Sequence, residues 1–142
     1  LEIIKNKEGI VLIHDVARPF VSRNLIEKVI DGTKRYGACI PVLKVSDTVK
    51  KVKKNIVEET IDRNKIFFAQ TPQGFNVNII KKAYEKGKKE KFIGTDDASF
   101  VERMGITVHC IQGERTNLKI TYPEDIIIGE TISKYLNEKD EK

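Results

Sequence analysis

The chain has 142 residues, of which 39% are hydrophobic and 33% are charged, and its formal net charge is +5. This size and composition are typical of one globular domain, residues 1–142, with a buried core. No apolar run approaches the ~20 residues that span a bilayer, and no charged-then-apolar signal segment opens the chain. We therefore expect a cytoplasmic protein without membrane partners, whose positive charge fits a polyanionic small ligand as well as nucleic acid.

Residues 10–20 read Ile-Val-Leu-Ile-His-Asp-Val-Ala-Arg-Pro-Phe. The unbroken apolar run at residues 10–13 predicts a strand buried on both faces, which is typical of a parallel sheet under helices. Asp15 then lies just past the carboxyl end of this strand, where open α/β sheets bind ligands, and Arg18 follows three residues later. A carboxylate and a guanidinium at this edge suit a phosphorylated substrate with a divalent metal. The alternative is that Asp15 caps a turn and Arg18 only pairs with it.

A helix and a second strand follow. Ser22 is a candidate N-cap, apolar residues recur at helical spacing from Leu25 to Ile30, and Gly37 supplies the C′ position. The apolar run Ala38–Leu43 then predicts another strand. The opening segment is therefore a strand–helix–strand unit of an α/β sheet, with the usual right-handed crossover.

Residues 44–61 have a different pattern. They are rich in lysine, and Lys54-Asn55 is a plausible turn between two short extended pieces. We predict a two-stranded arm that projects from the main sheet. A lone hairpin is only marginally stable in water, so we expect the arm to rest on a second copy of the chain. The alternative is a solvated loop whose lysines keep the protein soluble.

The segment after the arm returns to the core. Residues 66–70 predict a strand that ends sharply at Thr71, and Asn76 is expected to cap a helix that extends to about Lys86. Thr95 is expected to cap a shorter helix with two aspartates in its first turn. These carboxylates invite a metal-binding interpretation, but acidic residues commonly satisfy the helix dipole there, and we favour that explanation.

The last third of the chain predicts two strands and a helix. The strands are Ile106–Ile111 and the short Leu118–Ile120. Thr121 and Glu124 form a capping box with a proline in the first turn, which indicates a helix start. The apolar side of this final helix is expected to carry Ile127, Ile128, Thr131, Ile132, Tyr135 and Leu136.

Several reaction classes do not fit the residues. A metal phosphohydrolase needs more histidines and carboxylates than His14 and one other histidine provide. There is no nucleophile on a glycine-flanked elbow, no P-loop and no Gly-x-Gly-x-x-Gly motif. Cys39 and Cys110 lie in apolar runs and are expected to be buried, reduced thiols. RNA readers display exposed aromatics, whereas the aromatic pair at residues 67–68 is expected to be buried, so we expect no nucleic-acid partner.

Five cationic and hydroxyl groups at predicted strand ends remain as candidates for an anion site. They are Arg18, Thr48, Arg63, Thr71 and Lys119. Arg63 can instead pair with the preceding aspartate, Thr71 can cap a turn before proline, and Thr48 can be an ordinary strand residue. Lys119 is harder to dismiss, because a lysine in a short apolar strand needs an anion nearby.

These motifs together resemble one family. The matching stretches are His14-Asp-Val-Ala-Arg-Pro19, Asp47-Thr48, Asp62-Arg63, Gln70-Thr-Pro-Gln73, Thr95-Asp-Asp-Ala-Ser99 and Asn117-Leu-Lys-Ile-Thr121 followed by Pro123-Glu-Asp125. They occur in the family order and cover nearly every residue. With them the chain is similar to the C-terminal two-thirds of the 2-C-methyl-D-erythritol 4-phosphate cytidylyltransferase family.

The resemblance implies a fold and a reaction. The fold would be a doubly wound, mostly parallel α/β sheet of the nucleotidyltransferase type, with residues 44–61 as a dimerisation arm. The reaction would join CTP and 2-C-methyl-D-erythritol 4-phosphate, with Mg²⁺, to give CDP-methylerythritol and pyrophosphate in non-mevalonate isoprenoid biosynthesis. The attacking phosphate is already an anion, so no general base is needed.

The resemblance also implies roles for individual residues. Asp15 would hold the metal and approach the nucleotide, and Arg63 and Lys119 would position the substrate phosphate for attack on the α-phosphorus. Thr71 would contribute to the same pocket. Arg18 and Thr48 would reach the phosphate of the partner subunit's substrate through the exchanged arm.

The chain departs from the family pattern in two places. Val16 stands beside the nucleotide site where the family usually has alanine. The glycine-rich loop that cradles the CTP triphosphate is absent, and Leu1 to Ile4 look like the middle of a fold. We therefore expect that an N-terminal part is missing and that this piece alone has little activity. The alternatives are the related ribitol-5-phosphate cytidylyltransferase and a non-catalytic module that dimerises and binds anions.

Overall fold

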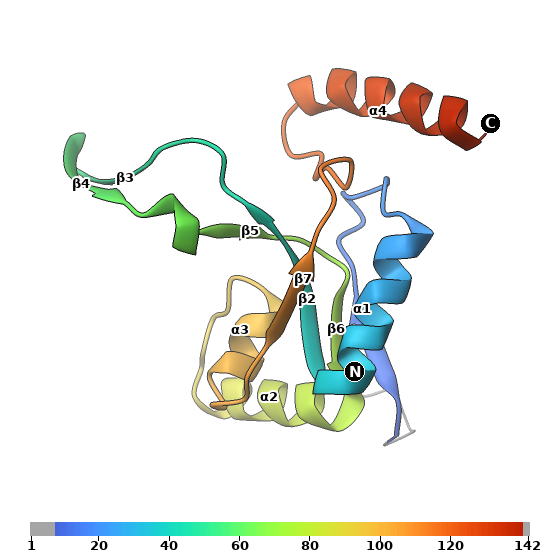
Figure 1. Cartoon of the computed structure of the whole chain (residues 1–142). Coiled ribbons are helices and arrows are strands. Elements are labelled where there is room, and N and C mark those ends of the chain that lie inside the picture. The colour runs from blue at the N-terminus through green and yellow to red at the C-terminus, as the bar shows by residue number, and fades with distance from the viewer. Residues whose placement is uncertain (1–7, 141–142) are drawn as a thin grey trace.

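The computed structural model describes residues 8–140, and Figure 1 shows a central sheet, helices around it and a separate two-stranded arm. The elements in chain order are β1 (Ile10–Ile13), α1 (Arg23–Tyr36), β2 (Ala38–Lys44), β3 (Val49–Lys53), β4 (Ile56–Ile61), η1 (Arg63–Lys65), β5 (Phe67–Ala69), β6 (Gln73–Asn76), α2 (Val77–Lys89), α3 (Asp97–Glu102), β7 (His109–Gln112) and α4 (Glu124–Asp140). Residues 1–4, which we interpreted as the middle of a fold, lie outside the described residues. Of the helices described, none combines the length and the apolar character that a membrane span requires.

The main sheet is mixed in direction. Its strand order is β1-β6-β2-β5, and β7 also pairs with β2. Within residues 8–140, the β2–β7 ladder is the one parallel pair of this sheet; the other three ladders are antiparallel. The prediction of an α/β sheet is confirmed, but the prediction of mostly parallel pairing is wrong for these residues. The chain returns from the arm through β5 and β6 without the helical crossover that parallel neighbours need.

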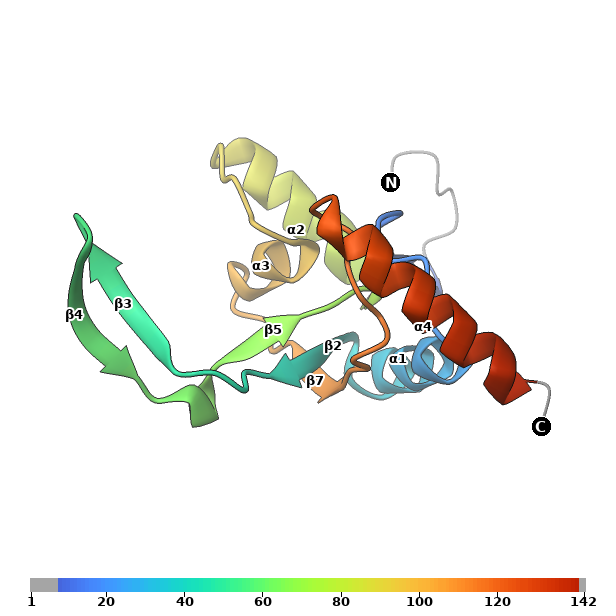
Figure 2. The same ribbon diagram turned by 90° about the horizontal axis from the view of Figure 1, so that it is seen from above.

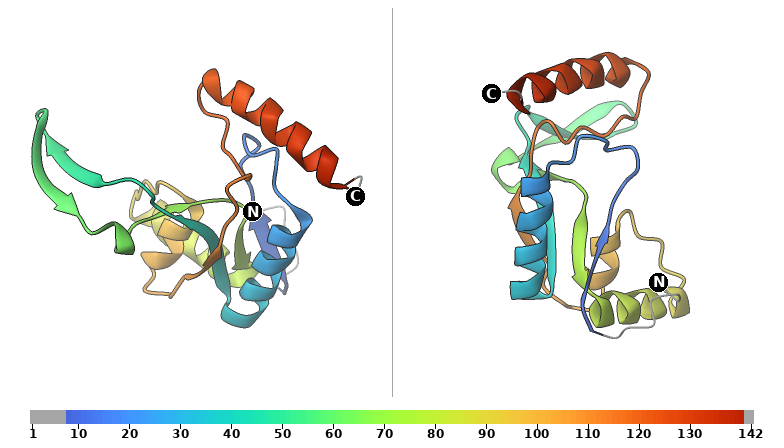
Figure 3. Two further views of the ribbon diagram at one scale, coloured as in Figure 1. Left: turned by 45° about the horizontal axis from the view of Figure 1, so that its top comes forward. Right: turned by 90° about the vertical axis from the view of Figure 1, so that its right-hand side faces the viewer.

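Helices cover both faces of this sheet, as Figure 3 shows. On one face, Gly32 of α1 approaches β2 so closely that a Cβ there would lie 2.4 Å from the Sγ of Cys39. The next residue of β2, Ile40, belongs to the core cluster that includes Ile80 of α2 and Val101 of α3. Since successive strand residues point to opposite faces, α1 lies on one face and α2 and α3 lie on the other. This is the doubly wound arrangement that the resemblance implied.

The helix ends follow the sequence signals with one exception. Ser22 and Asn76 cap α1 and α2 as predicted, and α1 ends at Gly37, whose φ of 84° is left-handed. The cap of α3 is Asp96 rather than Thr95, because the Asp96 carboxylate accepts the hydrogen bond from the amide three residues later. The start of α3 is therefore one residue later than predicted.

The region after β7 differs from the prediction. Residues 118–120 do not form a strand, because the amide of Ile120 bonds to the carbonyl of Ala17 in a loop rather than in a ladder. The predicted helix start is confirmed, but the side chain that reaches back is Asp125 rather than Glu124. Its Oδ2 accepts hydrogen bonds from the amides of Thr121 and Tyr122 at 2.8 and 2.9 Å.

The buried side of α4 agrees with the expected one in part, since Ile132 and Leu136 are half-buried on the same side as the buried Gly129. A Cβ at Gly129 would lie 3.3 Å from the Phe20 ring and 3.5 Å from Ile120, so this side of the helix packs on the body. Ile127 and Tyr135, which we expected on the buried side, are 70% and 54% exposed. The three consecutive isoleucines at the start of α4 cannot all face one neighbour, because they are spread around the helix.

The arm has the predicted strands and turn. β3 and β4 form their own two-stranded sheet, which extends away from the main sheet in Figures 1 and 2. Lys54 and Asn55 both have positive φ, as a tight hairpin turn needs. A register shift beside Lys51 brings its Nζ within 3.1 Å of Glu59 and 3.5 Å of Glu58. The role of the arm in dimerisation stays a prediction.

Two expectations about burial are wrong. Phe67 and Phe68 are 46% and 63% exposed, because β5 lies at an edge of the sheet. Cys39 is buried as expected, but Cys110 on the edge strand β7 is exposed, and both thiols are free. The burial argument against a nucleic-acid partner therefore does not hold.

Candidate substrate-binding site

The loop after β1 is fixed by hydrogen bonds to Thr71. The Oγ1 of Thr71 accepts a hydrogen bond from the amide of Asp15 at 3.0 Å and lies 2.9 Å from the Nδ1 of His14. The Nε2 of His14 lies 3.0 Å from the carbonyl of Arg18. A neutral imidazole with its proton on Nε2 satisfies both contacts, since Thr71 then donates to Nδ1. His14 is thus a structural residue that holds the Asp15 loop in place.

Asp15 lies between two cations. Its Oδ2 is 2.9 Å from the Nζ of Lys119 and 3.7 Å from the Nε of Arg18. The Lys119 and Asp15 side chains are 48% and 37% exposed, whereas the Arg18 side chain is only 11% exposed. Burial lowers the pKa of Arg18, although Asp15 opposes this effect. Both the functional interpretation of Arg18 and its simple pairing with Asp15 therefore fit the geometry.

Arg18 is tied to its own chain. Its Nη1 donates to the carbonyl of Asn117 at 2.8 Å, and its Nη2 donates to the carbonyl of Ala69 at 3.4 Å. The family resemblance implied a role for Arg18 toward the partner subunit's substrate. In the structure it lines the same cavity as Asp15 and Lys119.

Two buried amides hold the segment that carries Lys119. Gln70 donates to the carbonyls of Glu114 and Asn117, and its Oε1 accepts from the Glu114 amide at 3.1 Å. Asn117, which is fully buried, donates from its Nδ2 to the carbonyl of Thr71 at 2.8 Å. Both residues lie inside family motifs, at residues 70–73 and 117–121, but no role was predicted for them. For Gln70 the preceding apolar run is a signal of burial, and a buried amide must find partners, whereas Asn117 follows polar residues that give no such signal.

The cavity at this edge has a volume of about 460 Å³. Its lining combines residues from four separate parts of the chain: Asp15, Arg18, Ala69, Gln70, Thr71, Gln73, Gly94, Thr95, Asp96, Asp97, Phe100 and Lys119. This volume is within the range of small-molecule sites. The helix dipole alone was expected to account for Asp96 and Asp97, whereas the structure also places them in the wall of this cavity.

The remaining predicted site residues, Arg63, Thr48 and Val16, do not line the cavity. Arg63 is in η1 at the base of the arm, where its Nη1 donates to the carbonyl of Ser46 at 2.6 Å. Thr48 is exposed in the connection between β2 and β3, and Val16 is 97% exposed beside Asp15. Neither Arg63 nor Thr48 lines the cavity. One chain thus brings together Asp15, Arg18, Thr71 and Lys119, but not the residues at the base of the arm.

A metal ion at this edge would have few protein ligands. Among residues 8–140, no group of three or more His, Cys, Asp or Glu side chains could hold a metal ion together. Asp15 offers one carboxylate, and its Oδ2 already faces Lys119. Such a site fits Mg²⁺ rather than a tightly held transition metal, because Mg²⁺ is often bound by one or two carboxylates and the substrate's phosphates.

An α/β sheet with both faces covered defines the chain as a protein of the α/β class, and a carboxylate between two cations at its edge is typical of sites for phosphorylated ligands. A family model described as 2-C-methyl-D-erythritol 4-phosphate cytidylyltransferase matches residues 1–135. The chain belongs to this family, which confirms the resemblance seen in its motifs.

Relatives and solved structures agree with the family model. The chain is 46% identical over 132 residues to the 2-C-methyl-D-erythritol 4-phosphate cytidylyltransferase of Geobacillus thermodenitrificans, and 45% identical over 135 residues to that of Syntrophus aciditrophicus. These matches cover 93% and 94% of the chain but 58% of each relative. The chain thus spans a little over half the length of these relatives.

Two crystal structures show the same fold. The 2-C-methyl-D-erythritol 4-phosphate cytidylyltransferase of Thermus thermophilus has a TM-score of 0.83 at 37% identity, over 88% of this chain and 62% of that one. The enzyme of Francisella tularensis has a TM-score of 0.85 at 32% identity, over 92% of this chain and 63% of that one. The α/β fold class is therefore that of the family.

Proposed function

We propose that the protein containing this chain is a cytidylyltransferase, which joins CTP and 2-C-methyl-D-erythritol 4-phosphate to give CDP-methylerythritol and pyrophosphate. The observation that carries the proposal is the Asp15–Lys119 pair at 2.9 Å, with Arg18 behind it, at the rim of the cavity. The cations would bind the phosphate of the polyol substrate. We expect the protein to act in the cytoplasm, in isoprenoid biosynthesis.

This reaction requires that the two substrates are positioned and that the charge of their phosphates is neutralised. A phosphate oxygen of the polyol phosphate attacks the α-phosphorus of CTP, a new phosphorus–oxygen bond forms, and the bond to the bridging oxygen of the β-phosphate breaks. No proton has to be removed, because the attacking oxygen is already anionic. Lys119 is half exposed and can approach the substrate phosphate, whereas Arg18 is fixed by two carbonyls and supplies a stationary positive charge.

Mg²⁺ is the metal that we propose for this reaction, with Asp15 as its one carboxylate ligand from this chain. When bound, Mg²⁺ would neutralise charge on the nucleotide phosphates. Thr71 positions Asp15 through its backbone. Because its Oγ1 accepts the hydrogen bond of the Asp15 amide, it fixes the backbone from which the carboxylate projects.

A second copy of the chain would complete the site. Thr48 and Arg63 lie at the base of the arm, away from the cavity of their own chain, and we propose that they serve the cavity of the partner subunit. Exposed apolar side chains on the arm and β5 support this arrangement. They are Val52, Ile56, Val57, Phe67 and Phe68, each 46–69% exposed. Burying them between two copies would stabilise the dimer.

The test is turnover of the protein containing this chain with CTP and each polyol phosphate, measured as pyrophosphate release. We expect activity with 2-C-methyl-D-erythritol 4-phosphate, and we expect Lys119→Ala to lower kcat by about 100-fold or more, the usual cost of losing a charged transition-state contact. Preference for ribitol 5-phosphate would assign the related reaction instead. No turnover with either substrate would leave the non-catalytic anion-binding module as the better description.

A further inference from the structure

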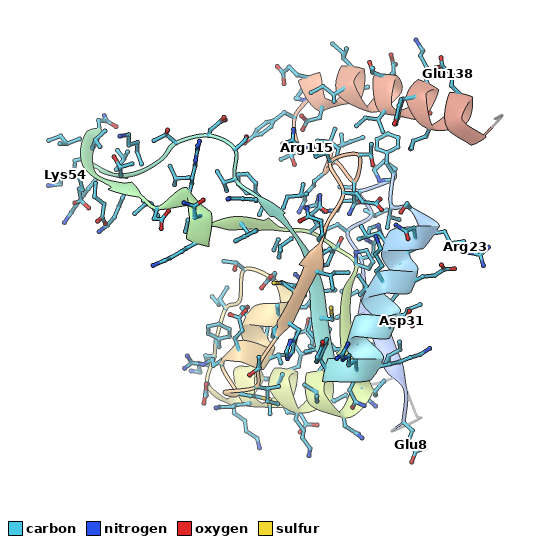
Figure 4. All side chains as sticks on the ribbon, viewed as in Figure 1. Glu8, Arg23, Asp31, Lys54, Arg115 and Glu138 are labelled. Carbon is cyan, nitrogen blue, oxygen red and sulfur yellow. The ribbon has the colours of Figure 1, made fainter. Side chains whose placement is uncertain are left out.

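The cavity shares Arg18 and Lys119 with a second hollow, to which Asp96 and Asp97 do not belong. This second hollow has a volume of about 310 Å³, adds Arg115 and contains no carboxylate. Figure 4 shows Arg115 on the connection between β7 and α4. The start of α3 contributes Asp96, its N-cap, and Asp97, its first residue, to the lining of the cavity. A phosphate group is favoured beside the cations, and hydroxyl groups, which can donate hydrogen bonds, are favoured beside the carboxylates.

Both carboxylate oxygens of Asp96 accept hydrogen bonds from other residues of the chain. Its Oδ2 accepts a hydrogen bond from the Nε2 of Gln73 at 2.9 Å, and its Oδ1 accepts one from the amide of Ser99 at 3.0 Å. Gln73 is 1% exposed, and its Oε1 accepts from the amide of Ala98 at 3.0 Å. These bonds fix the first turn of α3 to strand β6. Asp96 is therefore a structural residue.

Asp97 is held on one oxygen only. Its Oδ1 accepts a hydrogen bond from the hydroxyl of Tyr84, while its Oδ2 has no hydrogen-bond partner within the described part of the chain. The Tyr84 ring packs against Phe100, with 4.7 Å between the centroids. Burial, together with the hydrogen bond to Asp97, raises the pKa of Tyr84, so the phenol remains protonated and donates at neutral pH. The orientation of the Asp97 carboxylate is thus set by a group that does not titrate in the physiological range.

We propose that Asp97 is a specificity residue, which accepts a hydrogen bond from a hydroxyl group of the polyol substrate, and that Tyr84 is the positioning residue that aims it. This inference rests on the proposed function, because it names the polyol as the ligand of that same cavity. A carboxylate accepts but does not donate, so it selects a hydroxyl group over another acceptor. Its charge also disfavours a second phosphate in this part of the cavity.

The experiment compares two probes by calorimetry in the protein containing this chain. One probe is 2-C-methyl-D-erythritol 4-phosphate, and the other is inorganic phosphate, which has no polyol. In Asp97→Asn, Tyr84 can still donate to the amide oxygen, so the NH₂ group would face the substrate and offer a donor where an acceptor is needed. We expect the polyol phosphate to bind about 10-fold more weakly, the size of a lost hydrogen bond to a charged group, and inorganic phosphate to bind as in the wild type.

Tyr84→Phe removes only the hydroxyl and keeps the ring against Phe100. We expect a smaller loss, about 3-fold, with the KM for the polyol phosphate raised and kcat nearly unchanged. In the double variant Tyr84→Phe/Asp97→Asn the two effects should not add, because the residues act through one contact. Tyr135→Phe, on the exposed side of α4, is the matched control and should leave the affinity for both probes unchanged.

The possible results distinguish a failure of this inference from a failure of the proposed function. If the wild type binds and turns over the polyol phosphate but the Asp97 and Tyr84 variants do the same, the inference is wrong and the proposed function stands. Equal losses for both probes would also overturn it, because they would indicate general damage to the site. If the wild type neither binds nor turns over the polyol phosphate, the proposed function is wrong, and the role of Asp97 as a polyol acceptor falls with it.

Discussion

The cavity rim and the arm place their functional side chains in opposite ways. At the rim, Gln70 and Asn117 are buried and are bonded to the backbone of neighbouring loops, so Lys119 projects from a rigid support. On the arm, the polar contacts are between exposed side chains, as in the cluster of Lys51 with two glutamates. A rigid support fixes a side chain within one chain, whereas an exposed arm needs a second surface to fix it.

The difference explains where the proposed catalytic residues lie. Asp15, Thr71 and Lys119 meet at one rim because each belongs to a segment that is bonded to the others. The guanidinium of Arg63 donates instead to the carbonyl of Ser46 beside the arm. We therefore expect its function, and that of Thr48, to depend on dimerisation.

Complementation between two inactive variants gives the largest expected effect. Lys119→Ala and Arg63→Ala should each lower kcat by about 100-fold or more when present in every chain. If Arg63 serves the partner subunit's cavity, mixing equal amounts should form heterodimers in which one of the two sites is intact. Random exchange makes half of the dimers mixed, so activity should recover to about a quarter of the wild-type value. The measurement is pyrophosphate release before and after subunit exchange.

Two controls accompany this experiment. Mixing either variant with itself should give no recovery, and sedimentation should show a dimer in both variants. If dimers are present and exchange subunits but the mixture recovers no activity, Arg63 acts in the cavity of its own chain. A monomer at micromolar concentration would remove the arm from the proposed interface.

Gln70→Ala tests the rigid support and should have the largest effect on stability. It leaves the Glu114 amide without its partner, and it removes one of two donors from each of the carbonyls of Glu114 and Asn117. We expect the free energy of unfolding to fall by about 2–3 kcal/mol, because each unpaired buried polar group costs about 1–3 kcal/mol. Denaturant unfolding measures this change. Gln112→Ala, an exposed glutamine nearby, is the matched control and should cost less than about 0.5 kcal/mol.

Sequence reasoning found the elements of this fold wherever a local signal specified them. The cap at Ser22, the left-handed end at Gly37 and the turn at Lys54-Asn55 all appear where they were predicted, because each depends on the chemistry of a few adjacent residues. Strand β6 was not predicted, since its sequence of Gln, Gly, Phe and Asn has no strand pattern and its pairing is set by distant strands.

The site was predictable in part for the same reason. Asp15, Thr71 and Lys119 follow from family motifs, and the structure brings them together. Asp97 was interpreted as a helix-dipole residue, because the sequence does not reveal that Tyr84, thirteen residues earlier, would bond to it. The burial of Phe68 and Cys110 was predicted wrongly because both residues lie on edge strands. An apolar run has the same sequence pattern in the centre of a sheet and at its edge.

Asp125 links the exposed helix α4 to the loop that carries Lys119. Hydrogen bonds from the amides of Tyr122 and Thr121 lower the pKa of Asp125 below its ordinary value of 3.8. Because the folded pKa is the lower one, this cap is fully present above the unfolded pKa and is lost as the pH falls through the folded pKa. We expect the amides of Tyr122 and Thr121 to lose protection from hydrogen exchange as the pH is lowered below about 4. Asp125→Asn should show weaker protection without this pH dependence; an unchanged pH profile in the variant would assign the loss to another group.

Lys51→Ala should have the smallest effect and therefore sharpens the contrast with Gln70. Lys51 is 58% exposed and contacts Glu58 and Glu59, which are 36% and 54% exposed. Exposed ion pairs contribute about 0–1 kcal/mol, and the two glutamates that remain repel each other only weakly in water. We expect the free energy of unfolding to change by less than about 0.5 kcal/mol, with the difference shrinking as salt is raised. Lys53→Ala on the same strand is the control. A loss as large as that of Gln70→Ala would show that the arm is supported within its own chain and does not need a second surface.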